Sequence, residues 1–382
     1  MKKNSLNNLF LQEIEKAKSE DRFRELSISE RKSPAKIFRD NKEYISFSCN
    51  DYLGLANDKR LILASKKATD EYGTGAGASR LITGNNKLYK DLEDNISKLN
   101  STDETLVFSS GYLTNLGIIS AIFGKNDLLV IDKLSHSCII EGSFLSGAEV
   151  KRFHHNNYKN LEQILEKNRK NFKNCGIITE AVFSMDGDRA DLEKINKIAK
   201  KYDSFVIADF AHDINFSAQK YSIKNENFIK IGTLSKAFAG LGGYASGVKN
   251  IKSFLVNKCK PLIFSTALPP SVLASNNKAV EIVLSNKNIG KFALENAKYF
   301  YGLMKKKNSD FIIKEPESQI IPIIIGDSKK AVSMSKKLAE NGFLVHAIRP
   351  PTIPKNTARL RFSFSNSHTK EQIENLVEAI NL

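Results

Sequence analysis

Short apolar runs alternate with amphipathic helical stretches along the first two thirds of the chain. Runs rich in β-branched and aromatic residues predict strands at 105–108, 128–132, 176–179, 205–209, 228–232 and 243–248. Apolar positions three and four residues apart predict helices at 87–99, 112–123, 161–168 and 192–201. Strands separated by helices are typical of a mostly parallel sheet, so we expect one α/β core from about residue 50 to about residue 270.

The pattern changes after Pro269 and Pro270. Longer amphipathic stretches predict helices at 271–284, 291–306 and 331–340, and apolar runs predict strands at 320–325, 345–348 and 359–364. A last helix has Ile373, Leu376, Val377 and Ile380 on one face, and Thr369 and Gln372 have the spacing of a capping box. The chain therefore ends in a smaller α+β lobe.

Three segments follow from these patterns. Residues 1–45, helical from about Leu6 to Glu20, form an N-terminal segment that we expect to pack on the small domain or at a dimer interface. Residues 46–270 form a large α/β domain, and residues 271–382 form the small C-terminal α+β domain.

Composition narrows the class of protein. The chain has 382 residues, with 58 Lys and Arg against 42 Asp and Glu, and its four cysteines form no Cys-x-x-Cys pair. These features exclude a disulfide-stapled miniprotein and a zinc ribbon, and no apolar run is long enough to cross a membrane. We expect a cytoplasmic protein without a membrane partner.

The net charge of +16 raises the question of a nucleic-acid partner. The lysines are spread along the chain and alternate with acidic residues, as at Lys194 and Lys197 beside Asp191 and Glu193. Such spacing is typical of solvated helix faces, so we expect no nucleic acid. A basic surface also suits an acidic partner or an anionic cofactor or substrate.

Gly73, Gly75 and Gly77 suggest a dinucleotide-binding loop at first sight. The fingerprint fails because Ala78 and Arg80 stand where a third glycine is needed, and because the glycines follow a helix and not a strand. A turn where backbone approaches a ligand or a subunit boundary is the remaining interpretation.

Asp209 and His212 lie at the carboxyl end of the buried strand 205–209, where open α/β sheets bind their ligands. Taken alone, Asp209 is equally compatible with a helix cap or half of a metal site. Companions for a metal are lacking, because His154 and His155 are adjacent and would point apart on a strand. We expect no metal.

Lys236 follows the next strand, between hydroxyl residues and a glycine-rich stretch, Thr233-Leu-Ser-Lys-Ala-Phe-Ala-Gly-Leu-Gly-Gly243. A lysine amine at the sheet end can bind an aldehyde, and a neighbouring aspartate can pair with a pyridinium nitrogen. Hydroxyls and backbone amides can hold a phosphate. These are the requirements of pyridoxal 5′-phosphate (PLP), which we expect as the cofactor.

The sequence resembles the α-oxoamine synthase family of fold type I PLP enzymes over nearly its full length. The matching segments are Ser48-Cys-Asn-Asp-Tyr-Leu-Gly-Leu55, Tyr72-Gly-Thr-Gly75, Ser79-Arg-Leu-Ile-Thr-Gly-Asn85, Ser110-Gly-Tyr112, Leu134-Ser-His-Ser137, Thr179-Glu-Ala-Val-Phe-Ser-Met-Asp-Gly-Asp188 and Thr233-Leu-Ser-Lys236. The resemblance implies a large, mostly parallel mixed sheet flanked by helices and a smaller α+β C-terminal domain.

The C-terminal segment Ala347–Pro354, with Thr357-Ala-Arg-Leu-Arg361, is most similar to the family member that condenses L-alanine with a pimeloyl thioester and releases carbon dioxide. The acyl group would be carried by coenzyme A or by an acyl carrier protein. The resemblance also implies a homodimer with a shared active site.

The resemblance implies four catalytic residues and their neighbours. Lys236 would bind the PLP aldehyde and move the Cα proton, and Asp209 would pair with the pyridine nitrogen. His212 and Ser184 would bond near the ring hydroxyl, and His136 would stack on the ring and contact the substrate. Lys236, His136, Asp209 and His212 are the expected catalytic group.

Other positions would hold the phosphate and the substrates. Gly111, Tyr112 and Thr233 would line the phosphate and ring site, and Thr266 would reach the phosphate of the neighbouring subunit. The substrate set comprises Asn50 and Arg361 for the amino-acid carboxylate, and Arg24 and Thr352 for the acyl substrate. Singly, most of these residues have ordinary structural explanations; their occurrence together, in the family's order, favours the site.

The sequence departs from the family after Asp209. An acid and then Ala-His-Gly-Thr-Gly are usual there, whereas this chain has Phe210, Ala211, His212 and Asp213–Asn215. We expect this change to affect substrate entry or dimer contacts. Alternative functions are condensation of glycine with acetyl-CoA or another acyl donor, ordinary transamination, and a non-catalytic or nucleic-acid-binding protein on the same fold.

Overall fold

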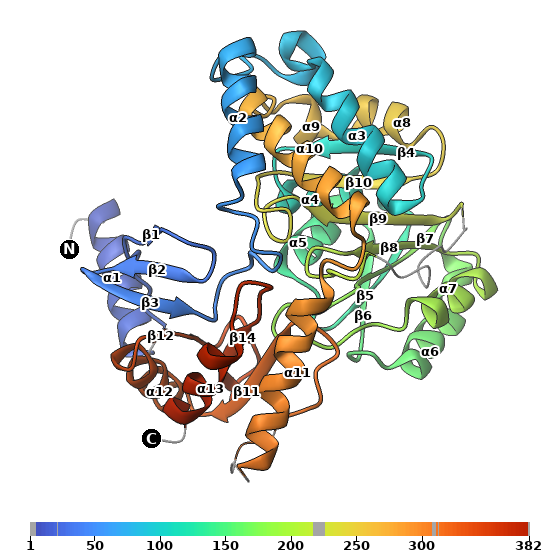
Figure 1. Cartoon of the computed structure of the whole chain (residues 1–382). Coiled ribbons are helices and arrows are strands. Elements are labelled where there is room, and N and C mark those ends of the chain that lie inside the picture. Colours follow the sequence, from blue (N-terminus) through green and yellow to red (C-terminus); the bar gives the residue numbers. More distant parts are fainter. Residues whose placement is uncertain (1–4, 21, 217–225, 308–310, 312, 381–382) are drawn as a thin grey trace. The chain divides into compact units, whose positions relative to one another are not determined.

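A computed structural model describes residues 5–20, 22–216, 226–307, 311 and 313–380. The chain divides into two compact units, whose helices and strands are labelled in Figure 1. The large unit is Asn50–Phe292, and the small unit combines Met1–Cys49 with Ala293–Leu382. The domain boundaries expected from the sequence, at 45/46 and 270/271, stay a prediction. The two compact units divide at 49/50 and 292/293.

The large unit is built on a seven-stranded sheet of order β4-β10-β9-β8-β7-β5-β6. Strands β9, β8, β7, β5 and β6 are parallel, and β10 runs antiparallel between β4 and β9. The strands are β4 (Glu104–Phe108), β5 (Leu128–Asp132), β6 (Glu149–Phe153), β7 (Cys175–Glu180), β8 (Phe205–Asp209), β9 (Phe228–Thr233) and β10 (Gly243–Gly247). The predicted fold class, a mostly parallel mixed sheet flanked by helices, is confirmed.

Helices cover both faces of this sheet, as Figure 1 shows. Strand residues such as Ile207 and Ile231 pack against α4, α5, α8 and α9, whereas Val206 and Phe228 pack toward α6 and α7. The helices of this unit are α2 (Lys59–Tyr72), α3 (Lys87–Asn100), α4 (Gly111–Ile122), α5 (Ser137–Ser146), α6 (Tyr158–Asn168), α7 (Leu192–Lys201), α8 (Ile251–Lys258), α9 (Lys260–Ile263) and α10 (Pro270–Ser285), with a π-helical turn at Arg80–Gly84 and a 3-10 turn at Arg169–Asn171.

The small unit contains two short sheets, of order β1-β2-β3-β12 and β11-β14-β13. Its strands are β1 (Glu30–Arg31), β2 (Lys36–Arg39), β3 (Lys42–Ser46), β11 (Ile320–Gly326), β12 (Phe343–Leu344), β13 (His346–Ile348) and β14 (Ala358–Ser363). Its helices are α1 (Leu6–Ser19), α11 (Lys291–Lys306), α12 (Ser328–Glu340) and α13 (Lys370–Ile380). Phe47, Phe300, Phe362 and Phe364 lie at the centre of its core.

The strand predicted at 345–348 corresponds to β13, and a second short strand, β12, precedes it. Phe343 and Leu344 pair in parallel with β3, whereas His346, Ala347 and Ile348 pair with β14. Residues 343–348 therefore form two short strands in different sheets. Val345, which is buried, lies between them.

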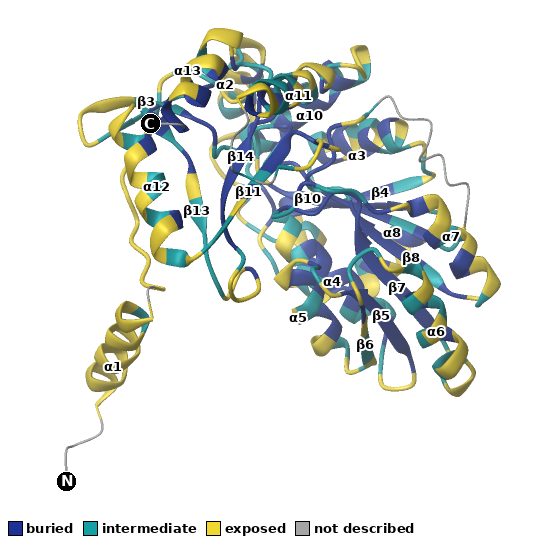
Figure 2. Ribbon diagram, turned by 90° about the horizontal axis from the view of Figure 1, so that it is seen from below, coloured by how far each residue is buried: buried dark blue, intermediate teal, exposed yellow. Residues whose placement is uncertain are grey.

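Helix α1 packs on no other element of the described chain closely enough to bury a residue. Its yellow ribbon in Figure 2 is exposed along nearly its whole length. Leu6, Phe10 and Ile14 repeat every four residues and are 72%, 57% and 39% exposed. Within the described residues, no helix combines the length and apolarity that a bilayer crossing requires.

Candidate active site

The candidate residues lie at one edge of the large sheet, where several strands end. The parallel strands β7, β8 and β9 end there at Glu180, Asp209 and Thr233, because parallel strands present their carboxyl ends together. Glu180 and Asp209 are direct neighbours in the β7–β8 register. Strand β10 begins at the same edge with Gly243 opposite Thr233, so the loop that carries Lys236 is held at both ends.

Lys236 joins a short chain of hydrogen bonds. Its Nζ lies 2.7 Å from His212 Nε2, and His212 Nδ1 lies 2.7 Å from the hydroxyl of the fully buried Tyr52. Tyr52 in turn donates to the side-chain oxygen of Asn50 at 3.0 Å. The structure thus brings together Lys236, His212 and Asn50, all of them predicted site residues, and adds Tyr52 as their link.

Asp209 is 6% exposed and fixed by two donors. Its Oδ2 accepts from Asn115 Nδ2 at 2.7 Å, and its Oδ1 accepts from the backbone N–H of Ala211 at 2.8 Å. Asn115 lies on α4, beneath the first turn of that helix. A buried carboxylate held in one orientation is suited to pair with a cationic group at the sheet edge.

His136 stands at the N-terminus of α5. Its backbone N–H donates to Glu180 Oε1 at 2.7 Å, and its Nδ1 lies 2.9 Å from Cys138 Sγ. Burial lowers the pKa of His136, so the neutral imidazole is favoured. The Tyr112 ring meets it edge-to-face with centroids 6.2 Å apart.

Glu180 is a second buried carboxyl group beside Asp209. Burial, and after it the charge of Asp209, raise the pKa of Glu180 to about 8. At neutral pH Glu180 is therefore mostly protonated.

The N-terminus of α4 forms a close-packed corner with the lysine loop. Ser110 caps the helix by accepting from the N–H of Leu113 at 3.1 Å. A Cβ on Gly111 would lie 3.1 Å from Thr233 Cβ, and one on Gly243 would lie 2.4 Å from Thr114 Oγ1. The Thr233 and Ser235 hydroxyls are 2.7 Å apart. Helix-end amides and hydroxyls of this kind are typical of phosphate sites.

Ser184 lies in the tight turn Phe183–Asp188, whose ends are joined by hydrogen bonds between Phe183 and Asp188 and between Gly187 and Phe183. The turn is tied to the sheet by His155, whose Nε2 is 2.7 Å from Asp188 Oδ2 and whose Nδ1 is 2.9 Å from Asp132 Oδ1. His155 thus has a structural role, as an ion-pair partner of two carboxylates.

The remaining predicted residues belong to other elements of the chain. Arg361 is buried on β14 of the small unit and donates to Ser363 Oγ at 2.8 Å. In the same unit Arg24 donates to Thr352 Oγ1 at 3.2 Å, so the two residues predicted to contact the acyl substrate contact each other. Thr266, in the large unit, is exposed and forms a β-bridge with Ser79.

Three residues of this site were not predicted from the sequence: Asn115, Glu180 and Tyr52. Each acts on a predicted residue from 44 to 160 positions away. Glu180 had a usable signal, because it ends a parallel strand beside the strand of Asp209. Asn115 and Tyr52 carry no comparable pattern.

The geometry of the large unit fits the requirements of PLP. The site offers an amine beside a histidine, an oriented carboxylate, an imidazole and a tyrosine ring, and a helix N-terminus with two hydroxyls. Asn115 Oδ1 is buried with no hydrogen-bond partner, at the side of Asp209. The charges of Asp209 and Lys236 both act on His136 and on Glu180, so these four groups form one cluster.

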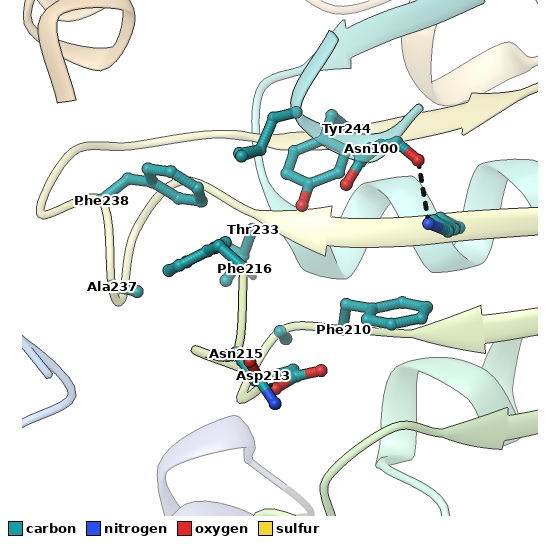
Figure 3. Close-up of a pocket in the computed structure, with 12 residues that line it drawn as sticks. Asn100, Phe210, Asp213, Asn215, Phe216, Thr233, Ala237, Phe238 and Tyr244 are labelled. Atoms are coloured by element: carbon teal, nitrogen blue, oxygen red, sulfur yellow. Dashed lines mark hydrogen bonds between the residues drawn. The ribbon is translucent and has the colours of Figure 1, made fainter. Parts of the chain in front are cut away.

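The altered segment after His212 is part of a different cavity, drawn in Figure 3. Asp213 is 8% exposed and pairs with Arg189 at 2.8 Å. Ile214 packs so closely on Gly290 that a Cβ on that glycine would lie 2.2 Å from the Ile214 carbonyl oxygen. The segment is thus anchored on both sides.

Comparison with known proteins agrees with this geometry. Residues 42–380 match the family model for class I and II aminotransferases. A relative named 8-amino-7-oxononanoate synthase, from Methylorubrum extorquens, is 39% identical over 94% of this chain and 90% of its own length.

Two solved structures are similar over most of the chain. A serine palmitoyltransferase variant from S. paucimobilis with a bound PLP–myriocin aldimine has a TM-score of 0.90 at 28% identity, covering 99% of this chain and 98% of its own. An 8-amino-7-oxononanoate synthase from Francisella tularensis has a TM-score of 0.74 at 30% identity, covering 88% and 96%. The chain therefore belongs to the class I and II aminotransferase family, in the branch that its 8-amino-7-oxononanoate synthase relatives form, as the sequence motifs predicted.

Proposed function

We propose that this protein is a PLP-dependent acyltransferase that condenses L-alanine with a pimeloyl thioester to give 8-amino-7-oxononanoate, carbon dioxide and the free carrier, a step of biotin biosynthesis. The observation that carries the proposal is the cluster of Lys236, His212, Asp209 and His136 in a chain 39% identical to a relative of that name. Coenzyme A and an acyl carrier protein are both compatible with it.

Lys236 would hold the cofactor and then move the proton at the Cα of alanine. His212, 2.7 Å away, would share a proton with its amine, and Tyr52 would keep the imidazole oriented. When bound, PLP would supply an electron sink for the amino acid's Cα. Asp209, held by Asn115, would keep the pyridine nitrogen protonated.

His136 would cover the ring face and contact the substrate, and Glu180 would fix its backbone. The α4 N-terminus at Gly111 and Tyr112, with Thr233, would bind the phosphate, and Ser184 would contact the ring hydroxyl. Asn50 and Arg361 would bind the alanine carboxylate, and Arg24 and Thr352 would meet the acyl chain.

The protein would act as a cytoplasmic homodimer in which Thr266 reaches the partner's phosphate site. Thr266 is exposed in the single chain, beside Phe264, which is 80% exposed. The four cysteines are all free thiols, as is usual in a reducing compartment.

The decisive experiment incubates the PLP-loaded protein with L-alanine and pimeloyl-CoA and measures 8-amino-7-oxononanoate by mass spectrometry. Parallel reactions contain glycine with acetyl-CoA, L-alanine with pimeloyl-acyl carrier protein, and L-alanine with a keto acid. We expect product only with L-alanine and a pimeloyl donor. Product with glycine and acetyl-CoA, or amino exchange with the keto acid, would replace the proposal by that activity.

Variants test the roles of the residues. Lys236→Ala should lower turnover by at least about a thousandfold and remove the protein-bound PLP absorbance. Asp209→Asn should lower kcat by about 10²–10³-fold while the protein still folds, because it removes a charge and keeps the shape. A Lys236→Ala protein with full turnover would contradict the mechanism.

A further inference from the structure

Behind the lysine loop, on the other side of β9 from α4, lies a small polar cavity of about 60 Å³. Figure 3 shows it between the ends of β8, β9 and β10, with Thr233 and Ala237 in its wall. On this measure a water molecule occupies about 10–15 Å³, so the cavity holds several waters or a small ion with its water.

Lys230 and the Asp213 carboxylate are the charged groups that line this cavity. Lys230 is 9% exposed, and its side chain alternates with Ile229 and Ile231, which pack on the opposite face of the sheet. Its Nζ donates to the carbonyl oxygen of Asn100 at 3.0 Å and lies 5.6 Å from the centre of the Phe210 ring. An ammonium group has three N–H donors, so one backbone bond leaves it capable of binding more.

The charge of Lys230 is not matched by a direct ion pair. Within the residues that the structure describes, the carboxylate whose charge acts on the pKa of Lys230 is Asp213. That carboxylate is paired with Arg189 at 2.8 Å. No described carboxylate forms a salt bridge with Lys230. Lys230, Asp213 and Arg189 together carry one net positive charge, and a buried charge without a counter-ion is costly.

The opposite wall adds a hydroxyl group. Tyr244 is 5% exposed, and Figure 3 shows its hydroxyl turned toward the cavity. The ring has room only because position 232 is glycine, where a Cβ would lie 2.3 Å from the Tyr244 Cζ atom. The Tyr244 hydroxyl also meets the Asn100 side chain, which lines the same cavity. A cation and a hydroxyl group around a small, partly aromatic space are groups that bind a small anion.

We propose that this cavity is a binding site for a small monovalent anion, a halide or a carboxylate of the size of formate, held by the ammonium of Lys230 and the hydroxyl of Tyr244. The site is separate from the one proposed for PLP and does not depend on the proposed reaction. An occupant would neutralise the charge behind the loop that carries Lys236.

The proton on Lys230 gives the site a definite pH dependence. Burial lowers the pKa of Lys230 to about 8, while the charge of Asp213 works in the opposite direction. The groups that face it are Asp213, with Arg189 behind it, and Tyr244, whose pKa burial raises. Since an anion needs the ammonium form, its affinity should be level below pH 8 and fall about tenfold per pH unit above it.

The first test is crystallographic and uses the full chain with PLP. Crystals soaked in sodium bromide should show an anomalous peak beside Lys230 Nζ, and crystals kept in the gluconate salt should show none. Ordered water alone in the bromide-soaked cavity would overturn the proposal.

The second test measures thermal unfolding at constant ionic strength while bromide replaces gluconate, which is too large for the cavity. The wild-type protein should gain a few degrees in Tm at saturating bromide, and less at pH 9.5 than at pH 7. Lys230→Met should lose this response, whereas the matched surface variant Lys197→Met should keep it. An unchanged response in Lys230→Met would assign the effect to bromide acting elsewhere.

Discussion

His155 shows how far the chemistry of a side chain depends on its surroundings. Its neighbour His154 is exposed, but His155 is 23% exposed between Asp132 and Asp188. Burial opposes the charged imidazolium, and the hydrogen bonds to the two aspartates outweigh it and raise the pKa of His155 to about 10. The imidazolium joins β5 to the turn that carries Ser184.

We expect His155→Gln to lower the free energy of unfolding by about 2–4 kcal/mol at pH 7, because two carboxylates lose their shared cation. The folded pKa lies above the unfolded value of about 6.5, so this contribution is complete below pH 6.5 and lost as the pH rises through 10. Urea unfolding at pH 6, 8 and 10 measures it, with His154→Gln as the control. Equal losses at pH 6 and pH 10 would show that the charge has no part in it.

Single residues also mark the limit of prediction from sequence. Asp209, His212 and Lys236 were identified because each follows a strand, and strand ends meet at one edge of a parallel sheet. Tyr52 and Asn115 could not be found in this way, since their roles depend on contacts across 160 and 94 positions. Their types and neighbours carry no periodic signal.

The helices and strands predicted from the sequence lie within a few residues of their expected bounds, whereas no bounds were predicted for α2, α5 and α8 although each has buried residues. The helix expected at 291–306 lies at Lys291–Lys306, and that at 331–340 begins earlier, at Ser328, because Asp327 caps it. Strand β6 was missed because Glu149–Phe153 is an edge strand with one fully buried residue, so its sequence has no apolar run. The strands β1, β2 and β3 were missed because each has at most one buried residue and none forms an apolar run.

The predicted capping box of α13 is confirmed. The Thr369 N–H donates to Gln372 Oε1 at 3.1 Å, and the Gln372 N–H donates to Thr369 Oγ1 at 3.2 Å. Thr369→Ala should therefore lower the free energy of unfolding by about 1 kcal/mol, whereas Thr369→Ser, which keeps the acceptor, should change it by a few tenths. Chemical denaturation of both variants measures this. Equal losses in the two variants would assign the effect to the missing methyl group.

The exposed apolar side of α1 bears on the assembly of the protein. A 14-residue helix that buries none of its own residues is marginal in water, so a partner surface is expected to stabilise it. Under the homodimer proposal, the second chain supplies that surface. Light scattering of the 42.7 kDa chain should then give about twice that mass.

We expect the triple variant Leu6→Ser, Phe10→Ser, Ile14→Ser to weaken the dimer by at least tenfold, measured by sedimentation across a dilution series. The control carries Asn8→Ser and Gln12→Ser, which change polar positions of the same helix. A dimer of unchanged strength would exclude α1 from the interface, and a wild-type monomer at micromolar concentration would contradict the homodimer.

The pairing of β3 with β12 has a consequence for synthesis on the ribosome. Ile45 pairs with Phe343, so about 300 residues are translated between the two partners. At a translation rate of roughly 5–20 residues per second, the edge of β3 that pairs with β12 stays open for about 15–60 s. The large unit, a continuous stretch from Asn50 to Phe292, is complete before β12 emerges from the exit tunnel. The nascent chain therefore carries an N-terminal β-sheet with one unpaired edge throughout the folding of its larger half, and this edge is a surface that a chaperone could bind during synthesis.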